Sequence, residues 1–502
     1  MNIFLKKNFL LNKDFYFLLF FLVSITLILF IFSTRYESTD GLRLFLTAAS
    51  LNDFSIQAYS NILPMHEFLT NPVNGNTYNK GPIGYAFFIF PFYTFFSLFF
   101  SGENSEVLRH LVPKFANAFY LSLILFYIYK ICSFYRIGIR NSYLCVIFIT
   151  FSTPLIFYSG SDLSEIVQAL LILCIYYYFF YCRKFALAFI LLFSLVLVKP
   201  IYILIFPILL CFIFNNLLNM NENSKVYLLN LIYGVLLAVL SVATILFINY
   251  IKTNNFLNFG DGVAFDNPVH YGVYSLLFSF GKGLFFYAPL MIVSFFFLFR
   301  DIIKNPKNEM HFIFILIVFI VFLIMYSKYH FWHGDWAWGP RYLVPFLPLL
   351  SIPMVKYFAQ LKKITIYSLF VFGFIVNSSS IYINPCNYLS LYFIQIKDTK
   401  SFDEQIQFHK HNRIYYDFHA SPVIILPLLS INKVISKKLN SRPLNYDYLD
   451  SNFINIDTTT YGNNSFYKKL KKSFRIKVLL LLFLSVFGLF FISRKNRLSD
   501  DK

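Results

Sequence analysis

Asp40 is the acidic residue whose position most suggests chemistry. It lies a few residues beyond the first long apolar run, and the segment 41–51 that follows it spaces its apolar residues as an amphipathic helix does. Charge is costly to keep at the mouth of a membrane protein, so a carboxylate there, with Lys80 in the same loop, is a candidate functional group. The alternative is that Asp40 only caps the helix that begins at Gly41.

The segment 329–350, YHFWHGDWAWGPRYLVPFLPLL, contains all three Trp of the chain and places an Arg before an apolar run. The planar guanidinium of Arg341 suits a phosphate. The alternative is an anchor at the membrane interface, which would explain Trp338 but not Asp335. His330 and His333 are residue types that bind metals, but their spacing with Asp335 forms no established motif, so no metal site is predicted.

Two acidic residues, Asp162 and Glu165, lie at the start of an apolar run in the segment SGSDLSEIVQALL (159–171). They either belong to a functional site or stabilise the helix start by capping it and by interacting with its dipole.

Two lysines lie beside helix-breaking residues. Lys282, in a Gly-Lys-Gly turn, is expected to be exposed at the membrane interface, where it either reaches a lipid phosphate or simply snorkels. Lys199 precedes a Pro in the middle of the apolar run 185–216. Because Pro breaks helices and Lys resists burial, this run is predicted to form two short helices.

The composition sets the fold class. The 502 residues are 58% hydrophobic and 13% charged, and mean hydropathy is +0.61, which indicates an all-α polytopic membrane protein and excludes a water-soluble domain. The net charge of +19 is explained by basic loops near lipid headgroups, so no nucleic acid partner is predicted. The six Cys form no CxxC pair, so neither a disulfide framework nor a zinc site is expected.

Apolar runs long enough to cross a bilayer lie near 15–33, 112–130, 143–159, 163–181, 185–198, 200–216, 227–250, 284–299, 311–327, 342–356, 364–383 and 476–493. The run 83–100 is ambiguous. If it crossed the membrane, the basic loops from Lys130 onward would lie outside, against the orientation bias. We therefore predict that 83–100 is a juxtamembrane or re-entrant helix, and that about 12 helices span the membrane, with both termini cytoplasmic.

This topology predicts three parts. Residues 1–383 form a transmembrane module with its first external loop at 34–111. Residues 384–475 form a small extracytoplasmic domain, and residues 476–502 form the last transmembrane helix and a basic cytoplasmic tail. Each motif-like stretch named above falls on the extracytoplasmic side.

The order of these motifs resembles the GT-C class of membrane glycosyltransferases. It resembles in particular the bacterial, family 39-like branch related to protein O-mannosyltransferases and the lipid A aminoarabinose transferase. The matching elements are STDGLRLFLTAASL, NKGPIGY, SDLSEIVQALL, LVLVKP, FSFGKGLFFYAPL, WHGDWAWGPRYLVPFLPLL and SPVIILPLL, which together fall within residues 1–430. Many relatives carry a second acidic residue beside the catalytic Asp, whereas here Gly41 follows Asp40.

The resemblance implies a GT-C fold in the bacterial inner membrane with an extracytoplasmic active site. It implies transfer of a sugar from a polyprenyl-phosphate donor to an envelope glycan, lipid or protein, with inversion and with Asp40 as general base. The residues assigned to the donor phosphate are Lys80, Lys199, Lys282 and Arg341, and the other site candidates are Glu165, Asp335, Trp338 and His330. No nucleotide or other cofactor is required, a divalent metal is not expected, and the remaining partners are membrane lipids.

Two other functions are weighed against this one. A polysaccharide-lipid flippase or transporter would carry charges along a path inside the bundle, often in repeated halves, and the sequence has no internal repeat. An O-antigen-type polymerase or ligase would lack an Asp directly after the first span. Transfer of a lipid-linked sugar is therefore the leading hypothesis.

Overall fold

The computed structural model describes residues 30, 38–57, 68–100, 105–219, 224–258, 264–334, 337–382, 413–416 and 421–439. The predicted first span (15–33) and last span (476–493) therefore lie almost wholly outside the described residues. Most of the predicted extracytoplasmic domain (384–475) lies outside them as well, as does Asp335.

Most of the described residues are helical, which confirms the predicted all-α class. The first part of the chain forms α2 (Thr39–Ser50), η2 (Leu51–Asp53), α3 (Gly84–Ser97), α4 (Ser105–Phe134), α5 (Ile139–Phe151), α6 (Leu155–Ser159), α7 (Glu165–Tyr176), η5 (Tyr177–Tyr181), α8 (Phe185–Val198), η6 (Pro200–Leu204), α9 (Ile205–Asn219) and α10 (Ser224–Thr253). The rest forms α11 (Val269–Phe278), α12 (Leu284–Tyr287), α13 (Leu290–Lys304), α14 (Met310–Lys328), η7 (Arg341–Phe346), α15 (Leu347–Leu350), α16 (Ile352–Tyr357), η8 (Phe358–Gln360), α17 (Lys363–Tyr382), α20 (Arg413–Tyr416) and α21 (Pro422–Leu439).

One small sheet interrupts the helices and was not predicted. Strands β1 (Phe68–Thr70) and β2 (Thr77–Asn79) pair antiparallel, with Leu69 opposite Tyr78. The sheet lies in the predicted first external loop, beside α2 and α10.

Five of the described helical segments are long and apolar enough to cross a membrane: Val107–Phe134, Lys225–Thr253, Met310–Lys328, Arg341–Gln360 and Lys363–Ile381. Each overlaps a predicted span. A helix that is apolar on all sides satisfies its own backbone hydrogen bonds and can face lipid, which suits these sequences to a bilayer. The other predicted spans that fall within the described residues correspond to shorter apolar helices, so the predicted number of crossings stays a prediction.

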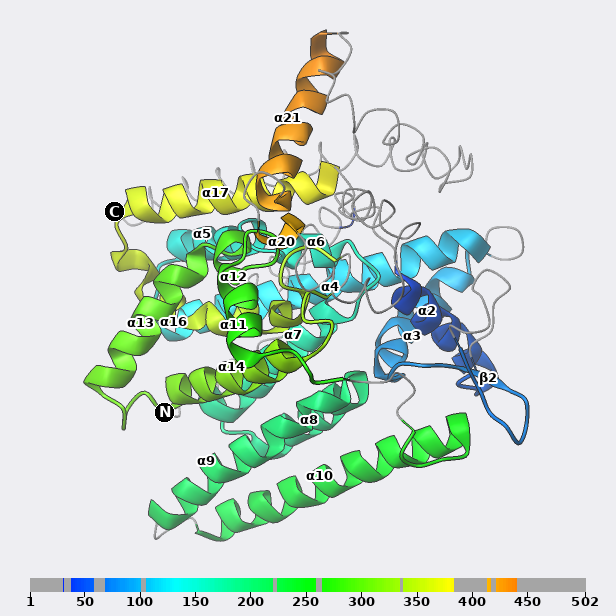
Figure 1. Cartoon of the computed structure of the whole chain (residues 1–502). Helices are drawn as coiled ribbons and strands as arrows, with labels where there is room; N and C mark the ends of the chain where they lie inside the picture. The colour runs from blue at the N-terminus through cyan, green and yellow to red at the C-terminus, as the bar shows by residue number, and fades with distance from the viewer. Residues whose placement is uncertain are drawn as a thin grey trace, which may run out of the picture.

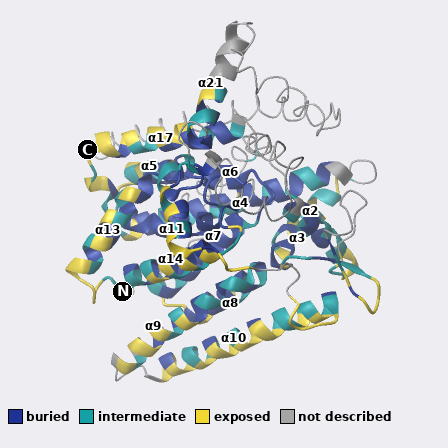
Figure 2. Cartoon of the chain, viewed as in Figure 1, coloured by how far each residue is buried: buried dark blue, intermediate teal, exposed yellow. Residues whose placement is uncertain are grey.

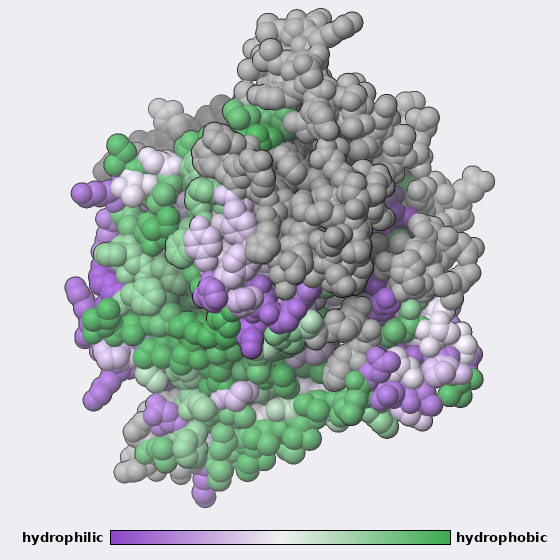
Figure 3. Space-filling model, in the orientation of Figure 1, coloured by the Kyte–Doolittle hydropathy of each residue, from purple (hydrophilic) through white to green (hydrophobic). Residues whose placement is uncertain are grey.

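Several long helices, α8, α9, α10, α14 and α17, run in similar directions, and α2, α3 and the β-hairpin gather at one end of them (Figure 1). The core is centred on α7, every residue of which is buried, whereas α10 is largely exposed (Figure 2). Apolar side chains cover most of the visible surface of α9 and α10, and hydrophilic side chains gather around the hairpin and at the opposite edge (Figure 3).

The predicted break in the run 185–216 is confirmed: α8 ends at Val198 and η6 begins at Pro200, with Lys199 in extended backbone between them. The run 83–100 forms a helix, α3, which packs on α2, α4 and α8. Gly84 at its start lies against the end of α8, since a Cβ there would be 2.2 Å from the carbonyl carbon of Leu197. This close approach places the start of α3 beside the end of α8, next to Lys199.

Candidate active site

The first turn of α2 presents Asp40 without using it as a cap. The N-cap is Ser38, whose hydroxyl accepts a hydrogen bond from the backbone N–H of Gly41 at 2.8 Å. A hydroxyl in this position satisfies one of the N–H groups that a helix start leaves unpaired. The alternative that Asp40 caps the helix is therefore wrong, and its carboxylate is available for other contacts.

Asp162, from the connection between α6 and α7, holds the start of α2 in place. Its carboxylate accepts hydrogen bonds from Ser38, from the backbone N–H at 2.8 Å and from the hydroxyl at 3.0 Å. The connection is itself fixed by Asn117 on α4, whose amide donates to the carbonyls of Ser161 and Leu163. Asp162 thus anchors another segment rather than capping its own helix.

The Gly41–Asp162 contact explains why a glycine follows Asp40. A Cβ built on Gly41 would lie 2.1 Å from Cγ and Oδ2 of Asp162. The space that a second acidic side chain would occupy in α2 is therefore filled by the carboxylate of Asp162, which comes from a distant part of the chain.

Asp40 lies in a cluster of charges from three segments. One oxygen, Oδ1, accepts a hydrogen bond from Arg43, one helical turn along α2. The other, Oδ2, accepts from Nη2 of Arg341, at the start of η7, at 3.2 Å. Nε of the same Arg341 donates to Oε1 of Glu165, at the start of α7, at 2.7 Å. Arg341 therefore bridges the carboxylates of Asp40 and Glu165.

The two carboxylates have different surroundings. The Glu165 side chain is 2% exposed, whereas the Asp40 side chain is 42% exposed and can be reached from outside. Burial favours a higher pKa for Asp40, but the charges of Arg341 and Arg43 outweigh it, so the pKa of Asp40 is lowered. Asp40 is thus ionised at neutral pH and able to accept a proton.

Lys199 adds a further cation near this cluster. Its ammonium lies over the rings of Tyr342 and Tyr326, 4.6 and 5.0 Å from their centroids, and cation–π contacts of this kind hold a Lys in one place. Burial lowers its pKa to about 8; Glu165 and Asp40 raise this pKa, and Arg341 lowers it. The guanidinium of Arg341 lies over the same Tyr342 ring, 5.9 Å from its centroid, so Lys199 and Arg341 share one aromatic partner.

Two glycines shape the turn that delivers Arg341. Gly334 and Gly339 have φ of +66° and +63°, a left-handed conformation that residues with a Cβ rarely adopt. At Gly334 a Cβ would also lie 2.6 Å from Cβ of Arg341. The glycines of the WHGDWAWGPR segment are therefore required by the backbone path into η7.

Three of the predicted site residues have structural contacts away from the cluster. Trp338 is buried, its Nε1 donates to Asn377 at 3.1 Å, and it belongs to the core. His330 contacts Asp266 through Nδ1 at 2.8 Å. Lys282 was expected in an exposed turn, and this is wrong: it is 1% exposed and donates to a backbone carbonyl at 2.6 Å. A buried ammonium needs such partners, which explains why Lys282 is held inside.

Lys80 lies at the end of β2 and is half-buried. The carbonyl of Gly81, next to it, accepts a hydrogen bond from Lys252 at 2.6 Å. Of the four predicted phosphate ligands, the structure thus brings Arg341 and Lys199 into the environment of Asp40.

Sequence reasoning missed Ser38 and Arg43. Both could have been found: Ser38 by its place before an amphipathic run, and Arg43 by its spacing of three residues from Asp40 on one helix face. Among the described residues, no group of three or more His, Cys, Asp or Glu side chains is arranged to hold a metal ion.

No protein-family model matches this sequence, and no curated protein matches it. The chain is similar to the crystal structure of ArnT from Cupriavidus metallidurans bound to undecaprenyl phosphate, with a TM-score of 0.45 and 12% identity over 85% of this chain and 79% of that one. For ArnT from the same organism in the apo state, the TM-score is 0.43 and the identity 12%, over 84% and 72%.

Proposed function

We propose that this protein is an integral-membrane glycosyltransferase that moves a sugar from a polyprenyl-phosphate donor to an extracytoplasmic acceptor. The observation that carries the proposal is the cluster of Asp40, Arg341 and Glu165 at the end of apolar helices, with Lys199 nearby. It combines an accessible carboxylate with cations that suit a phosphate, which are the groups that the GT-C-like motifs imply.

In the proposed reaction Asp40 is the general base. An acceptor hydroxyl is a weak nucleophile at neutral pH, and a carboxylate that takes its proton during attack increases its reactivity. The acceptor oxygen forms a bond to the anomeric carbon while the bond from that carbon to the phosphate oxygen breaks. Polyprenyl phosphate leaves with the electron pair, and this single displacement inverts the anomeric centre.

Arg341 and Lys199 are the proposed ligands of the donor phosphate. Negative charge grows on the phosphate oxygen as the bond breaks, and fixed cations stabilise that charge. The guanidinium can donate two parallel hydrogen bonds to a phosphate, and the ammonium adds a point charge. Lys80 stays a candidate for this role, whereas the burial of Lys282 removes it from the proposal.

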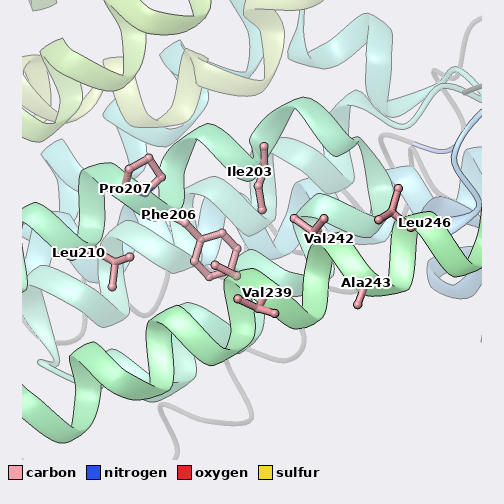
Figure 4. A pocket seen from close by; sticks show the side chains of 9 residues that line it. Ile203, Phe206, Pro207, Leu210, Val239, Val242, Ala243 and Leu246 are labelled. Carbon is pink, nitrogen blue, oxygen red and sulfur yellow. The ribbon is translucent and has the colours of Figure 1, made fainter. Parts of the chain in front are cut away.

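An apolar groove near Lys199 suits the lipid tail of such a donor. It has a volume of about 480 Å³, lies between η6, α9 and α10, and is lined by Ile203, Phe206, Pro207, Leu210, Ala238, Val239, Val242, Ala243 and Leu246 (Figure 4). Ile203 lies in η6, four residues after Lys199, which precedes this helix. An isoprenoid chain in this groove would gain from burial of apolar surface while its phosphate stays near the cations.

The proposed location is the bacterial inner membrane, with the site on the extracytoplasmic side and both termini in the cytoplasm. This sidedness is supported by the basic residues of the predicted cytoplasmic loops. The proposed acceptor is an envelope glycan, lipid or protein, and no nucleotide or nucleic acid takes part.

The proposal is tested by sugar transfer in membranes supplied with a radiolabelled polyprenyl-phosphate sugar. We expect Asp40→Asn to lower the rate by at least about 10²-fold at matched expression, because it removes the base but keeps the shape of the side chain. Asp53→Asn, an exposed carboxylate just beyond α2, is the control and should transfer at the wild-type rate. Transfer by Asp40→Asn at the wild-type rate would rule out Asp40 as the base. No transfer by the wild type would reject the donor class and favour the transporter.

A further inference from the structure

Arg341 is shared unequally between its two carboxylate partners. Nε is 2.7 Å from Glu165, whereas Nη2 is 3.2 Å from Asp40. The Glu165 side chain is 2% exposed and the Asp40 side chain is 42% exposed. One edge of the guanidinium is thus held inside the protein, and the other faces a group that incoming molecules can reach.

The two carboxylates also differ in what each would lose without Arg341. Glu165 has one oxygen bound to Arg341, and its second oxygen, Oε2, is buried with no hydrogen-bond partner among the described residues. A buried carboxylate that lost its only hydrogen-bonded cation would be strongly disfavoured. Asp40, in contrast, would keep Arg43, which binds its other oxygen from the same helix. The contact between Arg341 and Asp40 is therefore the easier one to exchange.

We propose that Arg341 is a shared ligand that passes from Asp40 to the phosphate of the donor, while Glu165 acts as a positioning residue that holds its Nε edge. This inference rests on the proposed function and concerns how the same site is switched on. Before the donor arrives, Arg341 occupies one oxygen of Asp40. When a phosphate takes Nη2, that oxygen becomes free to accept the proton of the acceptor, so the base is released only when the leaving group is in place.

The proposal makes a prediction that charge alone does not. If repulsion by the nearby carboxylates alone set the affinity for the phosphate, removing either carboxylate would increase that affinity, because each repels an anion. In the proposed arrangement Asp40 competes with the phosphate for Arg341, and Glu165 prepares Arg341 to receive it. Asp40→Asn should therefore tighten binding of a polyprenyl phosphate, and Glu165→Gln should weaken it. A change of about tenfold in each direction is within the range usual for coupled sites.

The test measures the Kd of undecaprenyl phosphate for the full-length chain in lipid nanodiscs. The variants are Asp40→Asn, Glu165→Gln, Arg341→Gln and the double variant Asp40→Asn/Arg341→Gln, with Asp53→Asn as a charge-matched control that should bind as the wild type does. The tightening caused by Asp40→Asn should disappear when Arg341 is absent, which a merely structural role of these residues does not predict. Each variant is first compared with the wild type in thermal unfolding.

If Glu165→Gln does not fold, Glu165→Asp takes its place. This variant keeps the charge and shortens the side chain, so a charge effect predicts no change in Kd and a positioning role predicts weaker binding. Should the wild type bind undecaprenyl phosphate while both neutral variants bind it more tightly, the sharing of Arg341 is wrong and the proposed function stands. Should the wild type not bind it, the donor class and this inference both fail.

Discussion

The contact between Gly41 and Asp162 allows a quantitative prediction for Gly41→Ala. The added methyl group would lie 2.1 Å from the Asp162 carboxylate, which would have to move away. Asp162 would then lose its two hydrogen bonds to Ser38. Hydrogen bonds to a charged acceptor contribute about 1.5–3 kcal/mol each, and Ala gains at most about 1 kcal/mol over Gly within a helix. We expect the free energy of unfolding to fall by about 2–5 kcal/mol.

The same change should also reduce activity, because the start of α2 determines where Asp40 lies. A shift of a reacting group by about 1 Å can cost about 10²-fold in rate. We would measure thermal unfolding in detergent and sugar transfer in membranes for Gly41→Ala. Gly138→Ala is the matched control, since a Cβ at Gly138 would meet no atom within 4 Å and its φ is −59°.

The double variant Gly41→Ala/Asp162→Ala identifies the cause. Without the carboxylate there is room for the methyl group, so the two substitutions together should cost clearly less than the sum of their separate effects. The reasoning is refuted if Gly41→Ala alone unfolds at the wild-type temperature and transfers sugar at the wild-type rate.

Three further predictions follow from the surroundings of single residues. Lys199 is expected to lose its charge as the pH rises through about 8, so the affinity for the donor should fall over that range. Lys199→Arg should move this fall in affinity to higher pH, and a Kd that does not vary with pH would contradict the prediction. Gly84→Ala places a methyl group 2.2 Å from the backbone of α8 and should destabilise the fold by about 1–3 kcal/mol. Gly81→Ala is the control: its nearest contact would be at 3.7 Å, so its unfolding temperature should equal that of the wild type. Lys282→Met should lower the unfolding temperature and leave the donor KM unchanged, because Lys282 donates to a buried carbonyl; a large rise in KM at unchanged stability would restore it as a phosphate ligand.

Much of the architecture could be read from the sequence because it depends on local composition. Long apolar runs must satisfy their backbone hydrogen bonds within the segment, so they form helices. The break at Lys199 and the helix 83–100 followed from the same rules, since Pro ends a helix locally and apolar periodicity is a property of neighbouring residues. Asp40 and Arg341 could also be proposed from their positions beside apolar runs.

What the sequence did not determine is which charged residues meet. Asp40 and Arg341 lie 301 positions apart, and several cations at the ends of apolar runs were equivalent candidates for the same role. The packing of α2, α7 and η7 brings Arg341 against Asp40 and Glu165, and it leaves Lys282 buried against a carbonyl. A side chain at the end of a helix can point to solvent, to lipid or to another helix, and only the packing of the other segments decides between them.

Asp162 and Gly41 show most clearly the difference between what a local sequence pattern predicts and what tertiary packing decides. The sequence by itself determined that Gly41 follows Asp40 and that Asp162 comes just before an apolar run that forms a helix. Only the tertiary structure decided that the carboxylate of Asp162 fills the space beside Gly41 and fixes the start of α2. The physical reason is that close packing is a property of surfaces brought together by folding, which no local pattern of residues records.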